Sequence, residues 1–342
     1  MFSDIPFWLS LVFIVGGLLA LVWSSDVFIE GSASVARSLG ISPLIIGMVI
    51  IGFGTSAPEL CVSVMSGLSH HSGISLGNAY GSCIFNIAVI LGAAALIFPM
   101  RTRPASSLLA GLILTAFTIL SFVLLSDGMC SRMDAGLLLV LFAITMPFYC
   151  WYDNKTNANN DSLEKNLVPE RIRLDKRYIK ITRLRFYISI FKLVIGLVVL
   201  IGSSHILVVG AVDLAKFLGV SDLLIGLTIV SIGTSLPELA SAVQSARKGE
   251  HDFVMGNIIG SNIFNMLAVV GLAVFITPTA DYSKNILTRD LPILAFLSIS
   301  ILLFGLNWRK IRENGIISRA NGVVWILIYV AYLILMFFEE VH

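Results

Sequence analysis

Residues 54–60 read Gly-Thr-Ser-Ala-Pro-Glu-Leu, and residues 233–239 read Gly-Thr-Ser-Leu-Pro-Glu-Leu. Moving outward, the pattern Gly-Asn-x-x-Gly-Ser-x-Ile-Phe-Asn occupies 77–86 and again 256–265. Both pairs are 179 residues apart, and at this offset 27 of the 69 positions from Ser24 to Gly92 are identical without a gap. General hydrophobicity does not reproduce Pro, Glu, Asn and Gly in register, so the chain contains an internal duplication.

The composition around these motifs is that of a protein whose solvent is lipid. Of the 342 residues, 57% are hydrophobic and 13% are charged, whereas soluble domains have about 25% charged residues. The net charge of +2 indicates no nucleic-acid partner. The five His and four Cys form no metal-ligand spacing and no CxxC motif.

Ten stretches are apolar and long enough to cross a bilayer. They cover 7–36, 42–69, 74–98, 105–126, 134–151, 186–217, 221–247, 252–276, 288–306 and 320–338. Five helices separate equivalent points of the two copies, and an odd number inserts the copies with opposite orientations. The predicted fold is an all-α membrane protein with ten transmembrane helices arranged as two inverted-topology five-helix repeats, an arrangement typical of transporters.

The basic residues predict the orientation of the chain in the membrane. Alternating loops carry 18 Lys and Arg on one side and 4 on the other, and nine of the 18 lie in the polar segment 152–185. The basic side is expected in the cytoplasm, which places both termini outside. The predicted domains are a first repeat over 1–151 with its motif at 52–92, a basic cytoplasmic linker over 152–185, and a second repeat over 186–342 with its motif at 231–271.

The motif around Pro58 predicts a broken helix. Proline lacks an amide hydrogen and clashes with the preceding turn, and backbone carbonyls freed at membrane depth are tolerated where they line a cavity or bind a ligand. If the helix resumes, Thr55 and Ser56 share a face with Glu59. Thr234, Ser235 and Glu238 repeat this arrangement in the second copy.

The second motif places three polar residues along one helix face in each copy. Asn78, Ser82 and Asn86 are four residues apart, and Asn257, Ser261 and Asn265 repeat the spacing. Carboxylates, hydroxyls, amide oxygens and freed carbonyls are hard donors, the ligands that Ca²⁺ prefers, whereas softer metals favour Cys or His. Two glutamates also match the charge of one Ca²⁺. We interpret the His70-His71 pair, which the second copy lacks, as a solvated loop.

These residues resemble the motifs of the calcium/cation antiporter superfamily, which includes the sodium/calcium exchangers, and the chain is most similar to its compact bacterial branch. The resemblance covers both motifs, the repeat spacing, the number of helices and the central loop. It implies ion ligands from both copies and backbone carbonyls near Gly52 and Ser231. The implied side-chain ligands are Thr55, Ser56, Glu59, Ser82, Asn86, Thr234, Ser235, Glu238, Ser261 and Asn265.

Two positions depart from the family pattern. Cys83 stands where Asn usually follows Gly-Ser, which affects the hydrogen bonds around the site rather than the ligand set. Asn265 stands where the potassium-dependent members typically have Asp. The resemblance therefore implies a site with two acids, in which co-transported K⁺ is not required.

We expect a secondary antiporter of a bacterial cytoplasmic (inner) membrane that exchanges Ca²⁺ for Na⁺, with Ca²⁺/H⁺ exchange through the same glutamates as the alternative. Its partners would be these ions and the lipid bilayer, with no cofactor, no nucleic acid and no obligatory protein partner. A cation channel is disfavoured because paired buried carboxylates bind ions too tightly for conduction. An enzyme is disfavoured because the sequence contains no HExxH, GxSxG or paired-Asp catalytic motif.

Overall fold

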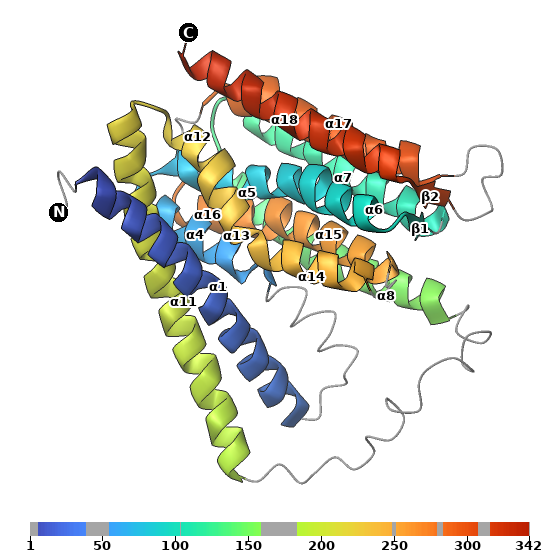
Figure 1. The fold of residues 1–342 in the computed structure, drawn as a ribbon, viewed down its shortest axis with the longest axis horizontal. Coiled ribbons are helices and arrows are strands. Elements are labelled where there is room, and N and C mark those ends of the chain that lie inside the picture. Colours follow the sequence, from blue (N-terminus) through green and yellow to red (C-terminus); the bar gives the residue numbers. More distant parts are fainter. Residues whose placement is uncertain are drawn as a thin grey trace.

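The computed structural model describes residues 6–38, 55–102, 104–158, 183–247, 251–278, 283–306 and 315–341, and these residues form a helical bundle with one short two-stranded sheet (Figure 1). The first-copy elements are α1 (Phe7–Ser38), α4 (Ala57–Leu68), α5 (Ser72–Phe85), η2 (Asn86–Leu91), α6 (Gly92–Ile97), β1 (Met100–Thr102), α7 (Pro104–Leu125) and α8 (Arg132–Ala158). The second-copy elements are α11 (Arg183–Leu218), α12 (Asp222–Ile225), η3 (Gly226–Val230), α13 (Ser231–Thr234), α14 (Leu236–Arg247), α15 (His251–Ile263), η4 (Phe264–Val269), α16 (Val270–Ile276), η5 (Ile286–Asp290), α17 (Leu291–Gly305), β2 (Gly315–Ile317) and α18 (Arg319–Val341).

Each of the ten predicted spans contains helix, although the lengths differ from the prediction. Six helical stretches of the described residues are long and apolar enough to cross a bilayer, and a seventh qualifies if α12–α13 and α14, which are bent by 43° at Ser235, count as one span. Of the predicted span 42–69, the part before residue 55 lies outside the described residues, and α4 is short. Large apolar side chains such as Trp8, Leu19 and Phe338 are exposed on the outer faces of the bundle, as in a multi-pass membrane protein.

The predicted linker is helical at both of its ends. Helix α8 continues to Ala158, and α11 begins at Arg183, so only 159–182 separates them, and those residues lie outside the described part. Two polar residues near helix ends have partners that the sequence did not predict. Arg289 is buried in η5, and His71, which lies in a loop and is partly exposed, is bonded to Asp222 (Nδ1–Oδ2 2.6 Å).

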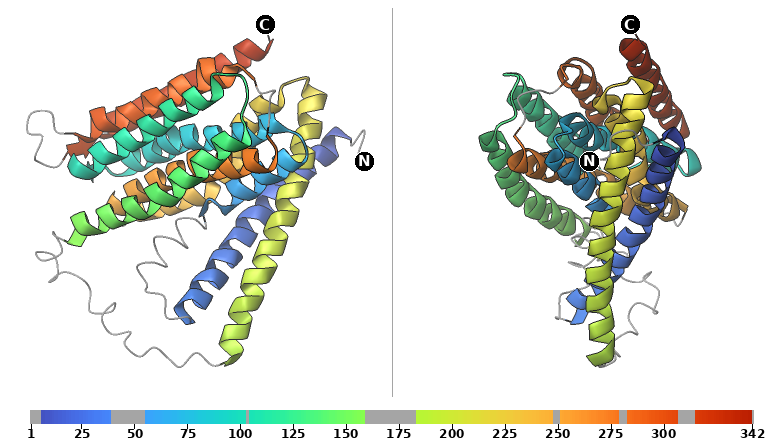
Figure 2. Two further views of the ribbon diagram at one scale, coloured as in Figure 1. Left: turned by 180° about the vertical axis from the view of Figure 1, so that it is seen from behind. Right: turned by 90° about the vertical axis from the view of Figure 1, so that its left-hand side faces the viewer.

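Helices α1 and α11 pack side by side and lie at an angle to the other helices (Figures 1 and 2). Glycines set their separation. A Cβ added at Gly17 would meet Leu207, and one added at Gly196 would meet the backbone of Phe28 at 2.6 Å. Gly196 is 179 residues after Gly17, and Leu207 is 179 residues after Phe28. The contact is therefore reciprocal, as a two-fold relation between the copies requires.

The same reciprocity continues along the helix pair. A Cβ at Gly31 would meet the backbone of Leu193 at 2.5 Å, and one at Gly210 would meet Ile14; Gly210 and Leu193 are the second-copy equivalents of Gly31 and Ile14. Next to Gly31 in the sequence, Glu30 on α1 pairs with Lys192 on α11 (Oε1–Nζ 2.5 Å). Lys192 lies within the predicted span 186–217, and this ion pair gives its charge a partner there.

Contacts between loops agree with the prediction that successive loops lie on alternate faces of the membrane. Strands β1 and β2 pair antiparallel, with Met100 opposite Ile317, and so join two loops that the basic residues assign to one face. The bond between His71 and Asp222 joins two loops assigned to the opposite face, and Arg132 Nε donates to Phe275 O (3.3 Å) at that same face. The compartment that each face meets remains a prediction.

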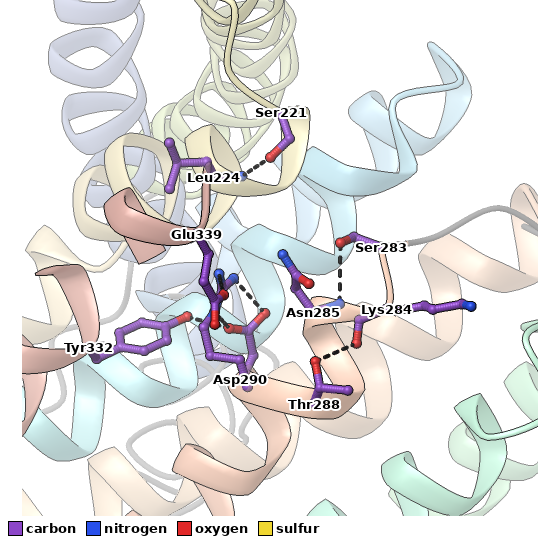
Figure 3. A network of polar contacts seen from close by, with 10 residues as sticks. Ser221, Leu224, Ser283, Lys284, Asn285, Thr288, Asp290, Tyr332 and Glu339 are labelled. Atoms are coloured by element: carbon purple, nitrogen blue, oxygen red, sulfur yellow. Dashed lines mark hydrogen bonds and ion pairs between the residues drawn. The ribbon is translucent and has the colours of Figure 1, made fainter. Parts of the chain in front are cut away.

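A buried polar network ties η5 to α18 at the end of the bundle near the C-terminus (Figure 3). Asp290 accepts hydrogen bonds from Arg289 Nε (2.7 Å) and from Tyr332 Oη (2.9 Å). Arg289 also donates to Glu339 on α18 (2.8 Å). Asp290 is fully buried and Arg289 nearly so, and because each charge has an opposite partner the pair can lie inside the protein.

The topology is tested with single cysteines at Phe2 and Lys155 in a background without native cysteines. We expect an impermeant thiol reagent to label Phe2→Cys from outside and Lys155→Cys from inside only, because the basic loops remain in the cytoplasm. Labelling of both positions from the same side would contradict the assignment.

The glycine contacts are tested by Gly→Ala substitutions scored by thermal unfolding in detergent. Gly31→Ala and Gly196→Ala should lower the unfolding temperature, since the new Cβ meets backbone that cannot move aside and overpacking costs about 1–3 kcal/mol. Gly16→Ala and Gly202→Ala are matched controls on the same two helices, because nothing lies within 4 Å of an added Cβ there. Equal effects at all four positions would show that close packing is not what these glycines provide.

Candidate cation-binding site

The second Pro-Glu motif follows a bend in its helix, as predicted, and in the first copy a turn at Ser56 stands just before the motif. Helix α4 begins at Ala57 after a turn at Ser56, and α14 begins at Leu236 after the bend at Ser235. Glu59 and Glu238 therefore lie in the first turn of a helix, where unpaired backbone amides favour a negative charge. Both carboxylates are completely buried.

Hydrogen bonds cross between the copies at these two carboxylates. Ser56 Oγ donates to Glu238 Oε1 (3.0 Å), and Ser235 Oγ donates to Glu59 Oε1 (3.0 Å). Ser235 and Glu238 are the second-copy equivalents of Ser56 and Glu59, so each copy's hydroxyl holds the other copy's acid. Ser56 also lies 3.1 Å from Ser261 Oγ, which brings α15 into the site.

The two polar helix faces meet at equivalent residues. Cys83 Sγ donates to Asn262 O (3.7 Å), and Asn262 Nδ2 donates to Cys83 O (3.3 Å). These residues are 179 positions apart in the sequence, so equivalent positions touch each other, as they do on a two-fold axis. Asn86 Nδ2 donates to Asn262 Oδ1 (3.0 Å), which orients the Asn86 amide with its oxygen turned away from Asn262.

Short π-helical turns follow both polar faces. Asn86 begins η2, and Asn265 is the second residue of η4. A π turn inserts an extra residue into a helix and is frequent at functional sites. It also displaces the carbonyl ladder locally, and so changes the direction in which these two amides point.

Among the buried oxygen atoms that lack a hydrogen-bond donor within the described residues, four belong to predicted ion ligands. They are Glu59 Oε2, Glu238 Oε2, Asn86 Oδ1 and Asn265 Oδ1. Two belong to each copy, and the two pairs occupy equivalent positions. An unpaired buried acceptor costs about 1–3 kcal/mol, and carboxylate and amide oxygens left unpaired in both copies suit a bound cation with hard oxygen ligands. In the described part of the chain, no group of three His, Cys, Asp or Glu gathers at one place.

The remaining predicted ligands lie around this centre, with one outside the described residues. Ser82 Oγ donates to the Ser231 carbonyl (3.5 Å), and Thr234 Oγ1 lies 3.3 Å from the same carbonyl while its proton has a closer acceptor in Asn78 Oδ1 (3.0 Å). Thr55 is buried. Gly52 lies outside the described residues, and its carbonyl remains a prediction.

Sequence reasoning did not identify three residues that hold the site in place. Asn262 bonds both Asn86 and Cys83. The sequence did contain a hint of this role, because the first copy has Cys83 where the second copy has Asn262. Asn78 was seen as part of a polar face, but its bonds to Ser63 Oγ and to the Glu59 carbonyl (2.8 and 3.0 Å) were not predicted. Ser63 has no equivalent hydroxyl in the second copy, so the repeat comparison concealed it.

Comparison with known proteins agrees with this geometry. The family described as "Sodium/calcium exchanger protein" matches residues 9–151 and 188–338, two stretches that begin 179 residues apart. The chain is 36% identical over 329 residues to a presumed antiporter named CaxA of Alkalimonas amylolytica, covering 95% of this chain and 98% of the relative. It is 33% identical over 323 residues to the inner membrane protein YrbG of Escherichia coli, covering 93% and 96%.

A solved structure extends the likeness to the fold. The sodium–calcium exchanger NCX_Mj, soaked with Na⁺ and Sr²⁺, superposes with a TM-score of 0.60 at 29% identity, covering 95% of this chain and 98% of that one. The family match spans most of the chain and both copies of the motif. This chain belongs to the sodium/calcium exchanger protein family.

Proposed function

We propose that this protein exchanges Ca²⁺ for Na⁺ across the cytoplasmic (inner) membrane of a bacterium by alternating access. The observation that carries the proposal is the set of four buried, unpaired oxygens, two from each copy, around the crossed Ser–Glu bonds. The relatives named as an antiporter, an inner membrane protein and a sodium–calcium exchanger support the same reading.

Charge explains why exchange would be obligatory. An ionised side chain at the centre of a bilayer costs roughly 2.5–3.5 kcal/mol on insertion scales, and two facing carboxylates repel each other. One Ca²⁺ neutralises both, so the occupied site can cross the barrier between its inward- and outward-facing forms more easily than the empty one. Replacement by Na⁺ needs more than one ion: two Na⁺ balance the charge of one Ca²⁺, and a third Na⁺ makes the cycle electrogenic, which we propose.

The ligand set that we propose combines both copies. Glu59 and Glu238 supply the charge, and neutral oxygens complete the coordination of the ion. The neutral donors proposed are Thr55, Ser56, Ser82, Asn86, Thr234, Ser235, Ser261 and Asn265, with the carbonyls of Gly52 and Ser231.

Alternating access follows from the repeat if the copies insert in opposite orientations. The reciprocal glycine contacts of α1 with α11 and the meeting of Cys83 with Asn262 support a two-fold relation between the copies. The proposed topology is ten spanning helices with both termini outside. In this arrangement a motion of one half that opens the site to one face corresponds to an equivalent motion of the other half that opens it to the opposite face.

Proton coupling is the second candidate, and one observation favours it. Neither carboxylate has a basic partner among the described residues, and each accepts a serine hydroxyl on one oxygen only. Protonation also neutralises a carboxylate, so H⁺ competes for the same atoms. Acid pH should therefore inhibit Ca²⁺ uptake whether Na⁺ or H⁺ is the counter-ion, and only a flux driven by a pH gradient without Na⁺ supports H⁺ exchange.

The site is tested by Glu59→Gln and Glu238→Gln in protein reconstituted into liposomes. Each variant should lose ⁴⁵Ca²⁺ exchange while remaining folded in the membrane, because one carboxylate leaves half of the Ca²⁺ charge uncompensated at low dielectric. Glu30→Gln is the control, since this exposed acid pairs with Lys192 and the second copy has no acid at the equivalent position, Val209. Near-normal exchange by either site variant would contradict the assignment.

The coupling ion is tested by Na⁺-driven ⁴⁵Ca²⁺ flux with and without K⁺, at fixed pH and clamped membrane potential. We expect equal flux in both conditions, because Asn86 and Asn265 contribute neutral amides where an additional acid would hold K⁺. Strict dependence on K⁺ would refute this reasoning, and flux that follows a pH gradient and ignores Na⁺ would establish the proton alternative.

A further inference from the structure

One amide beside the site is fully hydrogen-bonded, while its equivalent in the second copy is not. Asn78 Nδ2 donates to Ser63 Oγ (2.8 Å) and to the Glu59 carbonyl (3.0 Å), and its Oδ1 accepts from Thr234 Oγ1 (3.0 Å). One side chain thus joins α4, α5 and α13. The group formed by Ser63, Ser75 and Asn78 is called the amide clamp below.

The clamp is stiffened by a pair of reciprocal bonds between α4 and α5. Ser63 Oγ donates to the Ser75 carbonyl (3.1 Å), and Ser75 Oγ donates to the Ser63 carbonyl (2.8 Å). All three clamp residues are buried. Because a satisfied buried network rigidifies the groups that it joins, the backbone that carries Glu59 is held at its carbonyl.

The second copy has the amide but lacks the hydroxyls. Asn257 is equivalent to Asn78, whereas Ser63 is replaced by Ala242 and Ser75 by Val254. Helices α14 and α15 still pack together as α4 and α5 do. Asn257 Nδ2 is buried and has no acceptor within the described ranges. At the position equivalent to Ser63, which accepts from Asn78, Ala242 offers no hydroxyl oxygen.

We propose that Ser63 and Asn78 are positioning residues that fix the Glu59 half of the ion site, and that Ala242 leaves the Glu238 half free to readjust when the ion is exchanged. The two halves are then mechanically unequal. In a transporter built from inverted copies, the motion of one half opens the site to one membrane face, and the equivalent motion of the other half opens it to the opposite face. If one half is stiffer than the other, the apparent affinity for Ca²⁺ differs between the two faces. The inference rests on the proposed function, since it assumes exchange by alternating access.

The test measures the KM and kcat for Ca²⁺ at each membrane face in proteoliposomes of defined orientation. Ser63→Ala removes the acceptor of the Asn78 amide and should raise KM by about fivefold, the effect of one net hydrogen bond, with kcat changed much less. Ser63→Cys keeps the volume while weakening the acceptor, and should behave like Ser63→Ala. Ser66→Ala is the matched control, because this buried hydroxyl bonds only carbonyls of its own helix (Val62 O 2.7 Å, Ser63 O 3.2 Å).

The second copy supplies the decisive comparison. Ala242→Ser offers the missing acceptor to Asn257. The ratio of the KM values at the two faces should move in the same direction in Ser63→Ala and in Ala242→Ser, because one weakens the first half and the other stiffens the second. The double variant should show the largest change in this ratio. A purely structural role for Ser63 would lower kcat or the amount of folded protein without moving this ratio.

The outcomes separate the inference from the function on which it rests. If the unsubstituted protein exchanges no Ca²⁺ for Na⁺, the proposed function fails. If it does exchange, and the ratio shifts in opposite directions in the two single variants or equals that of Ser66→Ala, only the clamp is refuted. A shared direction with a larger shift in the double variant supports it.

Discussion

Hydroxyl-to-carboxylate bonds that cross between the two copies hold the centre of the bundle. Glu59 and Glu238 are buried where an ionised group is expensive, and each receives its donor from the opposite copy. Two acids and their amide neighbours come together around these bonds. The helix turns before the Pro-Glu motifs, the π turns and the glycine contacts between helices all contribute to this arrangement. Each copy alone would leave its carboxylate without the hydroxyl that it uses here.

Much of this arrangement could be predicted from the sequence because the duplication acts as an internal alignment. The Pro-Glu motif predicted the break before α4 and the bend at Ser235, and the repeated glutamates predicted the acids that the fold brings together. Each of the ten apolar stretches found by hydropathy contains helix, but only six or seven of the described helical stretches are long enough to cross a bilayer. Hydropathy also did not predict where helices end, since a helix continues through polar residues wherever its backbone bonds remain satisfied. Helix α8 does so to Ala158.

The features that were missed are those in which the copies differ. Ser63 faces Asn78, yet its equivalent is Ala242, so a comparison of repeats discards it. His71 bonds Asp222, and Arg289 bonds Asp290; neither pair recurs at the equivalent positions. Long-range pairing of side chains depends on the tertiary packing of helices, which periodicity does not describe. Comparison of the two copies identified the site residues that both share. Residues that differ between the copies could be assigned a role only from the structure.

The crossed bonds have a consequence for how the protein is made. Ser235 follows Glu59 by 176 residues, and ribosomes extend a chain at about 5–20 residues per second. The first acid therefore enters the bilayer roughly ten seconds or more before its donor has been synthesised. During that interval the half-built bundle must keep the acid protonated, hydrated or sheltered by the insertion machinery. Biogenesis, as much as transport, constrains where such a carboxylate can be placed.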